Sequence, residues 1–268
     1  MTPELPGRLA LGIEYNGSQF NGWQAQKSPS VSTIQETLEA VLSEVADQPV
    51  ALTCAGRTDT GVHATGQVVH FDCSHARPDS AWLRGANSLL PATIAVRWAR
   101  QVDHEFHARF TATARRYRYV IYNHPLKPAL LGGLVTHHHY ALDAACMHEA
   151  GQALLGEQDF SAYRGAACQS GTPMRNVMSL KVSRQGDFVL LDIEANAFLL
   201  HMVRNIAGVL LEIGEGRQAP AWAGEVLASR DRTLGGVTAP PDGLYLVGVS
   251  YPASYGLPEG PVFPAFPG

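Results

Sequence analysis

The residues of this sequence best placed to do chemistry are a guanidinium and a carboxylate in one short turn. Arg57 and Asp59 stand two residues apart between Gly56 and Gly61, and apolar runs flank the turn. Glycine tolerates tight or left-handed backbone, so such a turn can present side chains in a cleft. A carboxylate presented there could act as a nucleophile or as a general acid or base. The alternative is an ordinary hairpin turn whose aspartate bonds its own backbone.

Two other reactions of such a turn are poorly supported. Gly56 to Gly61 fits the beginning of a phosphate-binding P-loop, but Val62 and His63 stand where lysine and serine or threonine are needed. A glycosidase needs a second carboxylate, and the next acid, Asp72, falls on a predicted strand some distance away. The sequence therefore disfavours a nucleotide-triphosphate site and ordinary hydrolysis.

A second candidate region, residues 104–127, combines basic and aromatic side chains against a single acid, Glu105. Its members are Arg109, Arg115, Arg116, Arg118 and Lys127, with Phe106, Phe110, Tyr117, Tyr119 and Tyr122 between them. Guanidinium groups pair with phosphates and flat rings stack on exposed bases, so the segment favours a nucleic-acid partner. The alternative is a strand with surface arginines and core tyrosines. The formal net charge of −4 argues against a globally basic protein but leaves room for a local basic patch.

A predicted helix, 198–213, carries one polar stripe on an otherwise apolar circumference. The stripe consists of His201, Arg204, Asn205, Gly208 and Glu212. Such a helix is expected to be covered, and a covered Arg204 needs an anionic partner, because an unpaired buried charge is strongly destabilising. Asp59 is the attractive candidate for that partner.

A run of three histidines, residues 137–139, raises the question of a metal site. No neighbouring cysteine and no His-x-x-x-His spacing completes a ligand set. We therefore expect a polar edge or loop there and no metal.

The elements that must position these residues follow from periodicity and turn signals. Predicted strands cover 8–16, 49–55, 64–73, 93–102, 115–123, 176–184, 187–196 and 244–251. Predicted helices cover 33–46, with Ser32 and Gln35 as a capping box, and 79–90, 142–156, 198–213 and 220–229. The order β-α-β-β-α-β thus occurs twice, with one extra helix. The expected fold is α+β, a tandem of two ferredoxin-like units that share an extended antiparallel sheet with helices packed on one face.

Three segments follow from this order: an N-terminal unit at 8–105 with the Asp59 turn, a C-terminal unit at 106–251, and a proline-rich, loosely ordered tail at 252–268. The 268 residues, 46% of them hydrophobic, are enough for two medium domains with real cores. Four scattered cysteines without a C-x-x-C motif favour reduced thiols in a cytosolic protein. Met1–Gly7 holds no apolar run, so we expect no signal peptide, and we expect no membrane span.

Six segments together resemble the signature of the tRNA pseudouridine synthase A (TruA) family. In order, these segments are 56–64, 106–110, 115–119, 159–160, 201–206 and 243–245. They cover most of the chain, up to about residue 251. The departures are small: Thr60 stands where the family commonly has alanine, and the proline-rich tail has no familiar counterpart.

The resemblance implies isomerisation of uridine to pseudouridine at positions 38, 39 and 40 of the tRNA anticodon stem-loop, by a cytoplasmic homodimer without a cofactor. A glycosidic C1′–N1 bond is broken and remade as C1′–C5, so no water is consumed and no second carboxylate is needed. This agrees with the lone Asp59. The resemblance leaves open whether Asp59 attacks C1′ or removes the C2′ proton.

The resemblance also implies roles for individual residues. Asp59 is similar to the catalytic nucleophile, and Arg57 to the residue that replaces the target base when it flips out of the stem. Tyr117 resembles the tyrosine that packs on the flipped base, Arg204 the arginine paired with the catalytic aspartate, and Leu244 a residue of the pocket wall. Implied tRNA contacts are Arg77, Phe106, His107, Ala108, Arg109, Phe110, Ala167, Cys168, Gln169, Ser170 and Gly171.

Two alternatives to an enzyme remain at this point. A non-catalytic tRNA-binding or chaperone protein on the same scaffold would need the basic segment but has no use for Asp59 and Arg204 together. A protein in which all these residues are structural would bind no tRNA at low salt.

Overall fold

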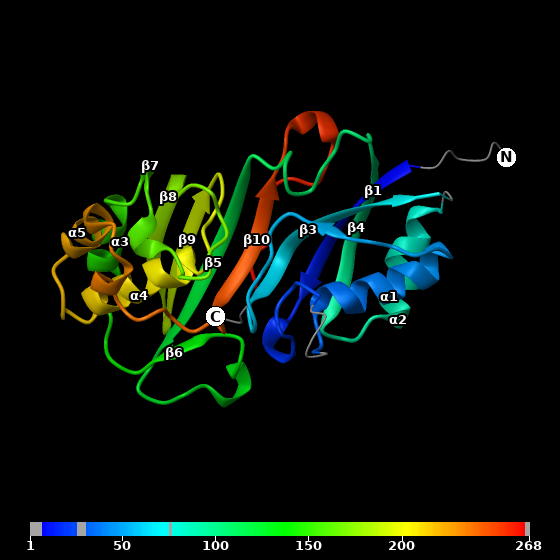
Figure 1. The fold of residues 1–268 in the computed structure, drawn as a ribbon. Helices are drawn as coiled ribbons and strands as arrows, with labels where there is room; N and C mark the ends of the chain where they lie inside the picture. Colours follow the sequence, from blue (N-terminus) through cyan, green and yellow to red (C-terminus); the bar gives the residue numbers. More distant parts are fainter. Residues whose placement is uncertain (1–6, 26–30, 75–76, 266–268) are drawn as a thin grey trace. The chain divides into compact units, whose positions relative to one another are not determined.

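A computed structural model describes residues 7–25, 31–74 and 77–265 of the chain (Figure 1). The chain divides into two compact units, residues 1–113 with 246–264 and residues 114–245 with 265–268. The division falls within the last strand, β10 (Leu244–Ser250), whose first two residues belong to the second unit. The secondary structure is mixed α and β with mostly antiparallel strand pairing, as the sequence predicts. We describe each unit by itself.

The first unit is built on β1 (Gly7–Tyr15), which pairs antiparallel with both β3 (His63–Cys73) and β4 (Ile94–Val102). The short β2 (Thr53–Cys54) pairs antiparallel with β3. The lateral order of these three long strands is therefore β4-β1-β3, and β2 pairs with β3 off this path. The predicted strand at 49–55 is confirmed only near its end. Before that, the backbone amides of Val50 and Leu52 donate to the side chains of Ser43 and Glu39 and not to a neighbouring strand.

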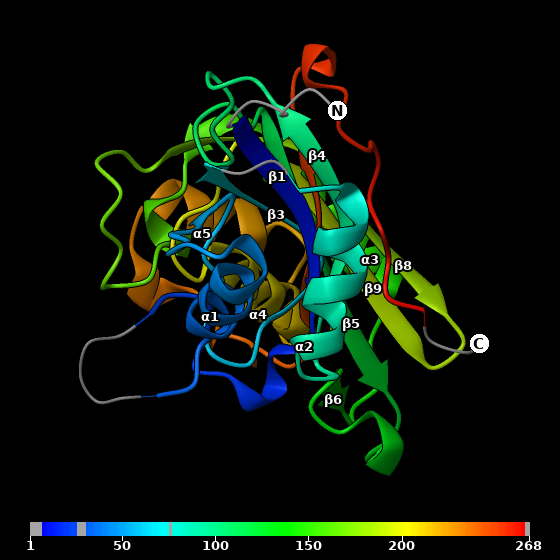
Figure 2. The same ribbon diagram turned by 90° about the vertical axis from the view of Figure 1, so that its right-hand side faces the viewer.

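Two helical segments lie beside each other on one face of this sheet (Figure 2). α1 (Ile34–Ala46) is amphipathic as predicted, but its capping box lies one residue later than expected. The Thr33 hydroxyl accepts a hydrogen bond from the Glu36 amide and donates one to the Glu36 carboxylate. The predicted helix 79–90 is a π-helical turn, Ala81–Gly85, followed by the single turn α2 (Ala86–Leu89).

The opposite face of the first sheet is covered by chain from 103–112 and from the tail. Phe106 and Ala108 are fully buried in a cluster with Val68 of β3, and Tyr251, Tyr255 and Leu257 pack against it. This packing explains why the compact division places 106–113 and 246–264 with the first unit, where the sequence-based boundaries are 8–105 and 106–251.

The tail is therefore better ordered than the sequence predicts. It forms a 3-10 turn at Ala253–Tyr255, and the Val262 amide donates to the Val247 carbonyl (2.8 Å). Thr65 of β3 also hydrogen-bonds the Val262 carbonyl. The ring of Tyr255 lies 5.1 Å from that of Phe106. Prolines do not prevent this packing, because the tail needs few backbone donors to lie across a preformed surface.

The second unit contains β5 (Ala114–Asn123), β9 (Phe188–Ala195), β8 (Met174–Gln185) and β7 (Gly156–Asp159), which pair antiparallel in that lateral order. On the other edge of β5, the Val120 amide donates to the carbonyl of Gly243, just before β10 (2.8 Å). The predicted hairpin at 176–184 and 187–196 is confirmed. β6 (Thr136–His138), which pairs parallel with β5, and β7 were not predicted as strands.

Three helices gather on one face of the second unit (Figure 1): α3 (Ala144–Gln152), α4 (Met202–Gly214) and α5 (Trp222–Ser229). α3 is shorter than the predicted 142–156. It begins at the Asp143 cap, and the chain enters β7 through Gly156, whose φ is +89°. α4 begins four residues later than predicted, after His201 in the left-handed region (φ +59°).

Among the described residues, none of the helices combines the length and apolarity needed to cross a bilayer. The expectation that Met1–Gly7 is no signal peptide falls on residues 1–6, which lie outside the described part of the chain, as do the last tail residues 266–268.

Candidate active site

The Asp59 turn, residues 56–62, is held by backbone bonds to the segment that follows β1. The Trp23 amide donates to the Thr58 carbonyl (3.0 Å), and the Gly61 amide donates to the Phe20 carbonyl (3.4 Å). Within the turn, the Val62 amide donates to the Asp59 carbonyl (3.1 Å). The turn is thus a fixed backbone shape.

Glycines make this close approach of two chain segments feasible. Gly61 and Gly22 both have positive φ, +80° and +82°. A Cβ at Gly22 would also lie 2.8 Å from the Thr58 carbonyl oxygen. The prediction that glycine allows a tight turn here is confirmed at Gly61. Gly22, which has the same backbone requirement, was not predicted.

Side chains of neighbouring strands hold the other side of the turn. Gln67 of β3 donates through Nε2 to the Gly56 carbonyl (2.7 Å), and its Oε1 accepts the Gly56 amide (3.4 Å). The hydroxyls of Tyr15 and Thr58 share a buried hydrogen bond of 2.8 Å. Both neighbours of Arg57 are therefore fixed, so the direction in which the turn presents its side chains is fixed as well.

The predicted chemical groups occupy the accessible side of this turn. Arg57 and Thr60 are exposed, and Asp59 is half-buried. Beneath the turn, burial raises the pKa of the Cys54 thiol to about 12, with Arg57 opposing this shift. Cys54 is thus a neutral core residue at neutral pH, and the turn presents one carboxylate and one guanidinium.

The predicted contact residues 106–110 form a compact tip in the first unit, which we call the imidazole tip (residues 103–112). Phe106 and Ala108 are buried, whereas Arg109 and Phe110 are exposed, Phe110 to 76%. The His107 ring stacks on Phe110 (4.3 Å), and its Nδ1 accepts the amides of Arg109 and Phe110 (both 3.2 Å). The tip can offer a cation and a flat ring, while its alanine and buried phenylalanine hold it in place.

Arg8 and His70 attach the imidazole tip to the sheet. Arg8 makes a bidentate pair with Asp72 (2.8 and 2.9 Å) and donates to the carbonyls of His104 and Phe106. His70 of β3 accepts the Ala108 amide at Nδ1 (3.1 Å). Burial, followed by the charge of Arg8, lowers the pKa of His70 to about 4. The predicted contact Arg77 is exposed on the chain that follows β3.

In the second unit, Tyr117 lies in β5 with 8% of its surface exposed, and its ring meets Phe198 edge-on (5.1 Å, 86°). Phe198 was not among the predicted site residues. Leu244, the first residue of β10, is buried, and its amide donates to the Pro241 carbonyl (2.8 Å).

Part of the polar stripe of α4 is covered by residues 232–239, at Arg204, Asn205 and Gly208. Arg204 donates through Nε to the Ala239 carbonyl (2.8 Å), and its own carbonyl accepts the Ala239 amide (3.1 Å). Asn205, fully buried, binds the Tyr163 carbonyl through Nδ2 and accepts from Arg232 and Thr238 at Oδ1. Arg204 is therefore half-buried and fixed in direction.

The second predicted contact loop, 167–171, is held by two arginines, and we call residues 164–175 the guanidinium loop. Arg164 donates to the carbonyls of Cys168 (2.7 Å) and Ser170 (2.8 Å). The buried Arg175 donates to Ser170 Oγ (2.7 Å) and to the carbonyls of Thr172 and Met174. Ala167, Gln169 and Gly171 are exposed on this frame.

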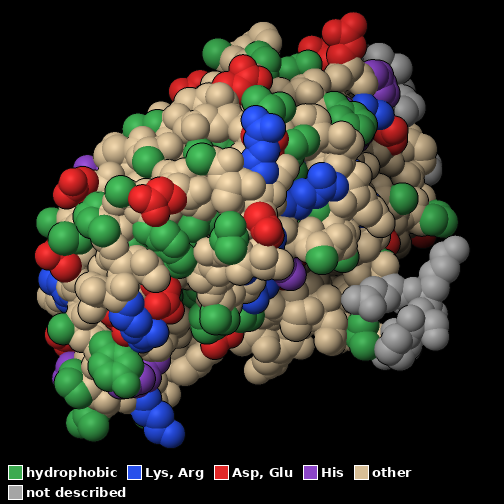
Figure 3. Space-filling model, turned by 60° about the vertical axis from the view of Figure 1, so that its left-hand side comes forward, with side chains coloured by type: hydrophobic (Ala, Val, Ile, Leu, Met, Phe, Trp, Pro, Cys, Tyr) green, Lys and Arg blue, Asp and Glu red, His purple; other side chains and the backbone are tan. Residues whose placement is uncertain are grey.

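The basic strand itself is less available for phosphates than its composition suggests. Arg118 forms a bidentate pair with Asp192 of β9 (2.8 and 2.7 Å), and Arg116 lies 3.9 Å from Glu194. Acidic and basic side chains are also interspersed on the face drawn in Figure 3. These cross-strand carboxylates were not predicted, because pairing register is not visible in a single strand.

The histidine run forms an edge with no ligand set for a metal. His138 lies 3.1 Å from Glu215, while Nε2 of His137 bonds the His124 carbonyl. Among the described residues, no group of three histidine, cysteine, aspartate or glutamate side chains is arranged to hold a metal ion.

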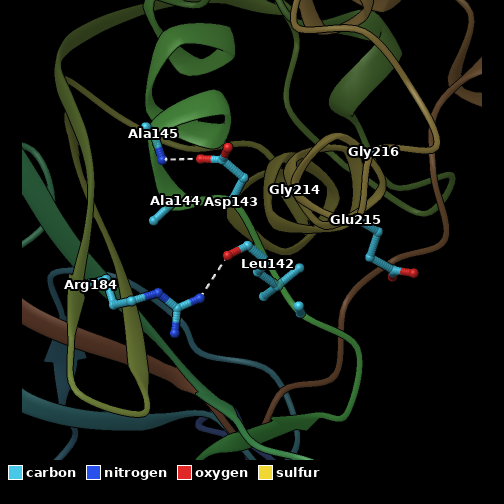
Figure 4. A pocket seen from close by; sticks show the side chains of 9 residues that line it. Leu142, Asp143, Ala144, Ala145, Arg184, Gly214, Glu215 and Gly216 are labelled. Atoms are coloured by element: carbon cyan, nitrogen blue, oxygen red, sulfur yellow. Dashed lines mark hydrogen bonds between the residues drawn. The ribbon is translucent and has the colours of Figure 1, made fainter.

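A hollow in the second unit is lined by none of the predicted site residues (Figure 4). Its lining includes Asp143, Arg184 and Glu215. Asp143 Oδ1 accepts the Ala145 amide (2.8 Å) as the cap of α3, and Arg184 donates to the Leu142 carbonyl (2.7 Å). Asp143 and Arg184 thus serve the local fold.

The structure thus places Arg57, Asp59, Arg77 and 106–110 in the first unit, and Tyr117, 167–171, Arg204 and Leu244 in the second. A model of the tRNA pseudouridine synthase family matches residues 12–111 and 150–252. The chain therefore belongs to the tRNA pseudouridine synthase family.

Among its relatives, the chain is similar to tRNA pseudouridine synthase A of Aeromonas hydrophila subsp. hydrophila, with 61% identity over 257 residues, which are 96% of this chain and 95% of the relative. It is also similar to tRNA pseudouridine synthase A of Aliivibrio fischeri strain MJ11, with 57% identity over 259 residues, 97% of this chain and 98% of the relative. In a solved Cbf5-Nop10-Gar1 complex, one chain aligns with 76% of this chain over 45% of its own length, at 12% identity and a TM-score of 0.32.

Proposed function

We propose that this chain isomerises uridine to pseudouridine in tRNA, at positions 38, 39 and 40 of the anticodon stem-loop. The observation that carries the proposal is a single carboxylate, Asp59, on a turn fixed from two sides, in a chain whose relatives over nearly its whole length are named tRNA pseudouridine synthase A. The comparisons give no support to a non-catalytic tRNA-binding or chaperone protein.

The chemistry balances without an added reactant. The C1′–N1 bond breaks, the detached base turns, C1′–C5 forms, and the proton on C5 leaves while N1 regains one. Asp59 acts at the ribose, either by adding to C1′ or by taking the C2′ proton. Either route needs one carboxylate held in a constant direction, which the fixed turn supports.

The other roles are proposed from residue chemistry. Arg57, exposed beside Asp59, takes the place of the flipped base, since extruding a stacked base leaves a gap in the stem. Tyr117 packs on the flipped base, Leu244 forms part of the pocket wall, and Arg204 balances the charge of Asp59. The imidazole tip, the guanidinium loop and Arg77 contact the tRNA backbone and bases.

We also infer that both units are ferredoxin-like and share one extended antiparallel sheet with helices on one face. The lateral order β4-β1-β3, the pairing of β2 with β3 and the element order of the first unit support this inference. The boundaries expected from the sequence, 8–105 and 106–251, differ from the compact division, which places 106–113 and 246–264 with the unit that carries Asp59. We further propose a cytoplasmic homodimer without a cofactor, which would let an acidic chain assemble a shared basic surface.

The test of the function is Asp59→Asn on unmodified tRNA, with pseudouridine mapped by position. We expect conversion to disappear while tRNA affinity changes little. Asp47→Asn is the matched control, because Asp47 is exposed, its φ is +54°, and asparagine tolerates that backbone. Normal turnover by Asp59→Asn would refute the catalytic assignment. A monomer in sedimentation at working concentration would refute the dimer.

A further inference from the structure

β3 carries an unusual set of buried polar side chains. Of its eleven residues, His63, Gln67 and His70 are polar and buried, with 1%, 0% and 6% of their surfaces exposed. Each makes a hydrogen bond to the backbone of a chain segment outside the strand: His63 to Gly17, Gln67 to Gly56 and His70 to Ala108. Burying a polar side chain is unfavourable unless it is hydrogen-bonded, so the fold requires each of these three hydrogen bonds.

Gln67 is bonded on both sides of its amide. Nε2 donates to the Gly56 carbonyl at 2.7 Å and lies 3.4 Å from the Tyr15 hydroxyl, which bonds Thr58. Oε1 accepts the amide of Val68 (3.2 Å) besides that of Gly56. One side chain thus reaches, directly or through one hydroxyl, the residues immediately before and after Arg57.

His70 performs the same task on the other face of the strand. Residues 67–70 pair in unbroken register with Ile13, Gly12, Leu11 and Ala10 of β1, so Gln67 and His70 point to opposite faces. On the face of His70, Val68 packs with Phe106 and Ala108. The His70 ring also lies against the rings of Phe106 (5.9 Å) and His107 (4.8 Å).

We propose that β3 positions two separate parts of the RNA-modifying apparatus: Gln67 is a positioning residue for the Asp59 turn, and His70 is a positioning residue for the imidazole tip. This inference rests on the proposed function. Neither side chain touches the substrate. Gln67 acts through Gly56 and Tyr15, and His70 acts through Ala108.

The two residues should therefore affect different kinetic parameters. A displaced Asp59 turn leaves the tRNA contacts of the imidazole tip and the guanidinium loop intact but misplaces the reacting carboxylate, and a shift of about 1 Å can cost about a hundredfold in rate. A loosened imidazole tip weakens tRNA contacts that are the same in the ground state and the transition state, so KM rises with kcat unchanged.

The experiment compares steady-state kinetics of full-length variants on unmodified tRNA. We expect Gln67→Leu to lower kcat by about ten- to a hundredfold with KM within about twofold. We expect His70→Leu to raise KM by about tenfold with kcat within about twofold, and His70→Asn, which keeps an acceptor near the position of Nδ1, to restore most of KM. Val69→Ala, equally buried between them on β3, is the matched control for lost stability.

If Gln67→Leu does not fold, Gln67→Glu assayed at alkaline pH replaces it, since the ionised carboxylate keeps the shape and the acceptor but cannot donate to the Gly56 carbonyl. A lowered kcat in that variant carries the same conclusion. The inference is overturned if wild type is active while the Gln67 and His70 variants change kcat and KM only as Val69→Ala does. A wild type that converts no uridine overturns the proposed function and this inference together.

Discussion

The imidazole tip and the guanidinium loop are both predicted to contact tRNA, yet they are held by opposite chemistry. In the first unit, ring nitrogens of His70 and His107 accept backbone amides. In the second unit, Arg164 and Arg175 donate to backbone carbonyls. The first arrangement uses neutral acceptors, and the second uses permanent cations.

The difference determines how each region responds to its surroundings. An imidazole nitrogen accepts only while it is unprotonated, so the imidazole tip depends on neutral histidines. Burial, followed by the charge of Arg8, lowers the pKa of both His70 and His107. The guanidinium loop has no such requirement, because arginine keeps its proton throughout the working range. Its two arginines do stabilise a negative charge on other side chains of the guanidinium loop.

The largest contrast is expected between one cysteine of each unit. Partial burial opposes ionisation of Cys168, but the Leu200 amide, the Ser170 amide and Arg164 together lower its pKa, whereas burial raises that of Cys54 to about 12. We expect iodoacetamide at pH 7.5 to modify Cys168 at least about a thousandfold faster than Cys54. Peptide mapping by mass spectrometry measures both rates in one sample. Equal rates would mean that the guanidinium loop does not stabilise an anion.

The next effect is on stability. Arg175→Met removes the guanidinium donor from the Met174 carbonyl and from Ser170 Oγ, while the Thr172 carbonyl keeps the hydrogen bond from the Ser170 hydroxyl. We expect a loss of about 2–4 kcal/mol in the free energy of unfolding, because bonds to a charged group are the stronger kind. Denaturant titration measures it. Arg184→Met, which removes an exposed arginine bonded to the Leu142 carbonyl, is the control and should lose less.

A smaller effect is expected from acid on the imidazole tip. Because the folded pKa values lie below the unfolded value of about 6.5, the stability contributed by His70 and His107 is complete above pH 6.5. That stability declines as the pH falls toward 4.

We expect the hydrogen-exchange protection of the Arg109 and Phe110 amides to fall about tenfold between pH 7.5 and 5, after correction for intrinsic rates. The Gly165 amide, which donates to the Leu200 carbonyl (2.8 Å), is the internal control and should keep its protection. Parallel losses at both places would remove the contrast between the two regions.

The smallest effect is expected in tRNA binding. His107→Ala removes the acceptor of two tip amides and the ring that stacks on Phe110. We expect the Kd for tRNA to rise about three- to tenfold, the size of one lost base-stacking or hydrogen-bonding contact. Filter binding at fixed salt measures it. An unchanged Kd would show that the exposed tip is not a contact.

The long periodic elements were predictable from the sequence. α1, α4 and the hairpin β8–β9 have patterns of apolar residues long enough to identify type and buried face. β6 and β7 were missed because three and four residues are too few to show a period, and they form only by pairing with longer strands. The capping box was displaced by one residue, since Ser32 and Thr33 are both competent caps and only packing selects between them.

The residues of the candidate site were predictable from the sequence. The hydrogen bonds that hold them in place were not. The turn at Asp59 shows its glycines in the sequence. Gln67 and His70, in contrast, look like polar interruptions of an apolar strand, and their partners Gly56 and Ala108 lie 11 and 38 residues away. Cross-strand acids such as Asp192, opposite Arg118, are hidden for the same reason. Bonds between distant residues depend on register, which a single sequence does not reveal.

The packing of the tail has a consequence for synthesis. The cluster around Phe106 is completed by Tyr251, Tyr255 and Leu257, close to the end of the chain. A ribosome that has made the first 113 residues must add all of 114–245 before these three emerge. During that interval the nascent first unit carries an uncovered aromatic surface of the kind that chaperones bind. The unit that is synthesised first is thus the one that is finished last.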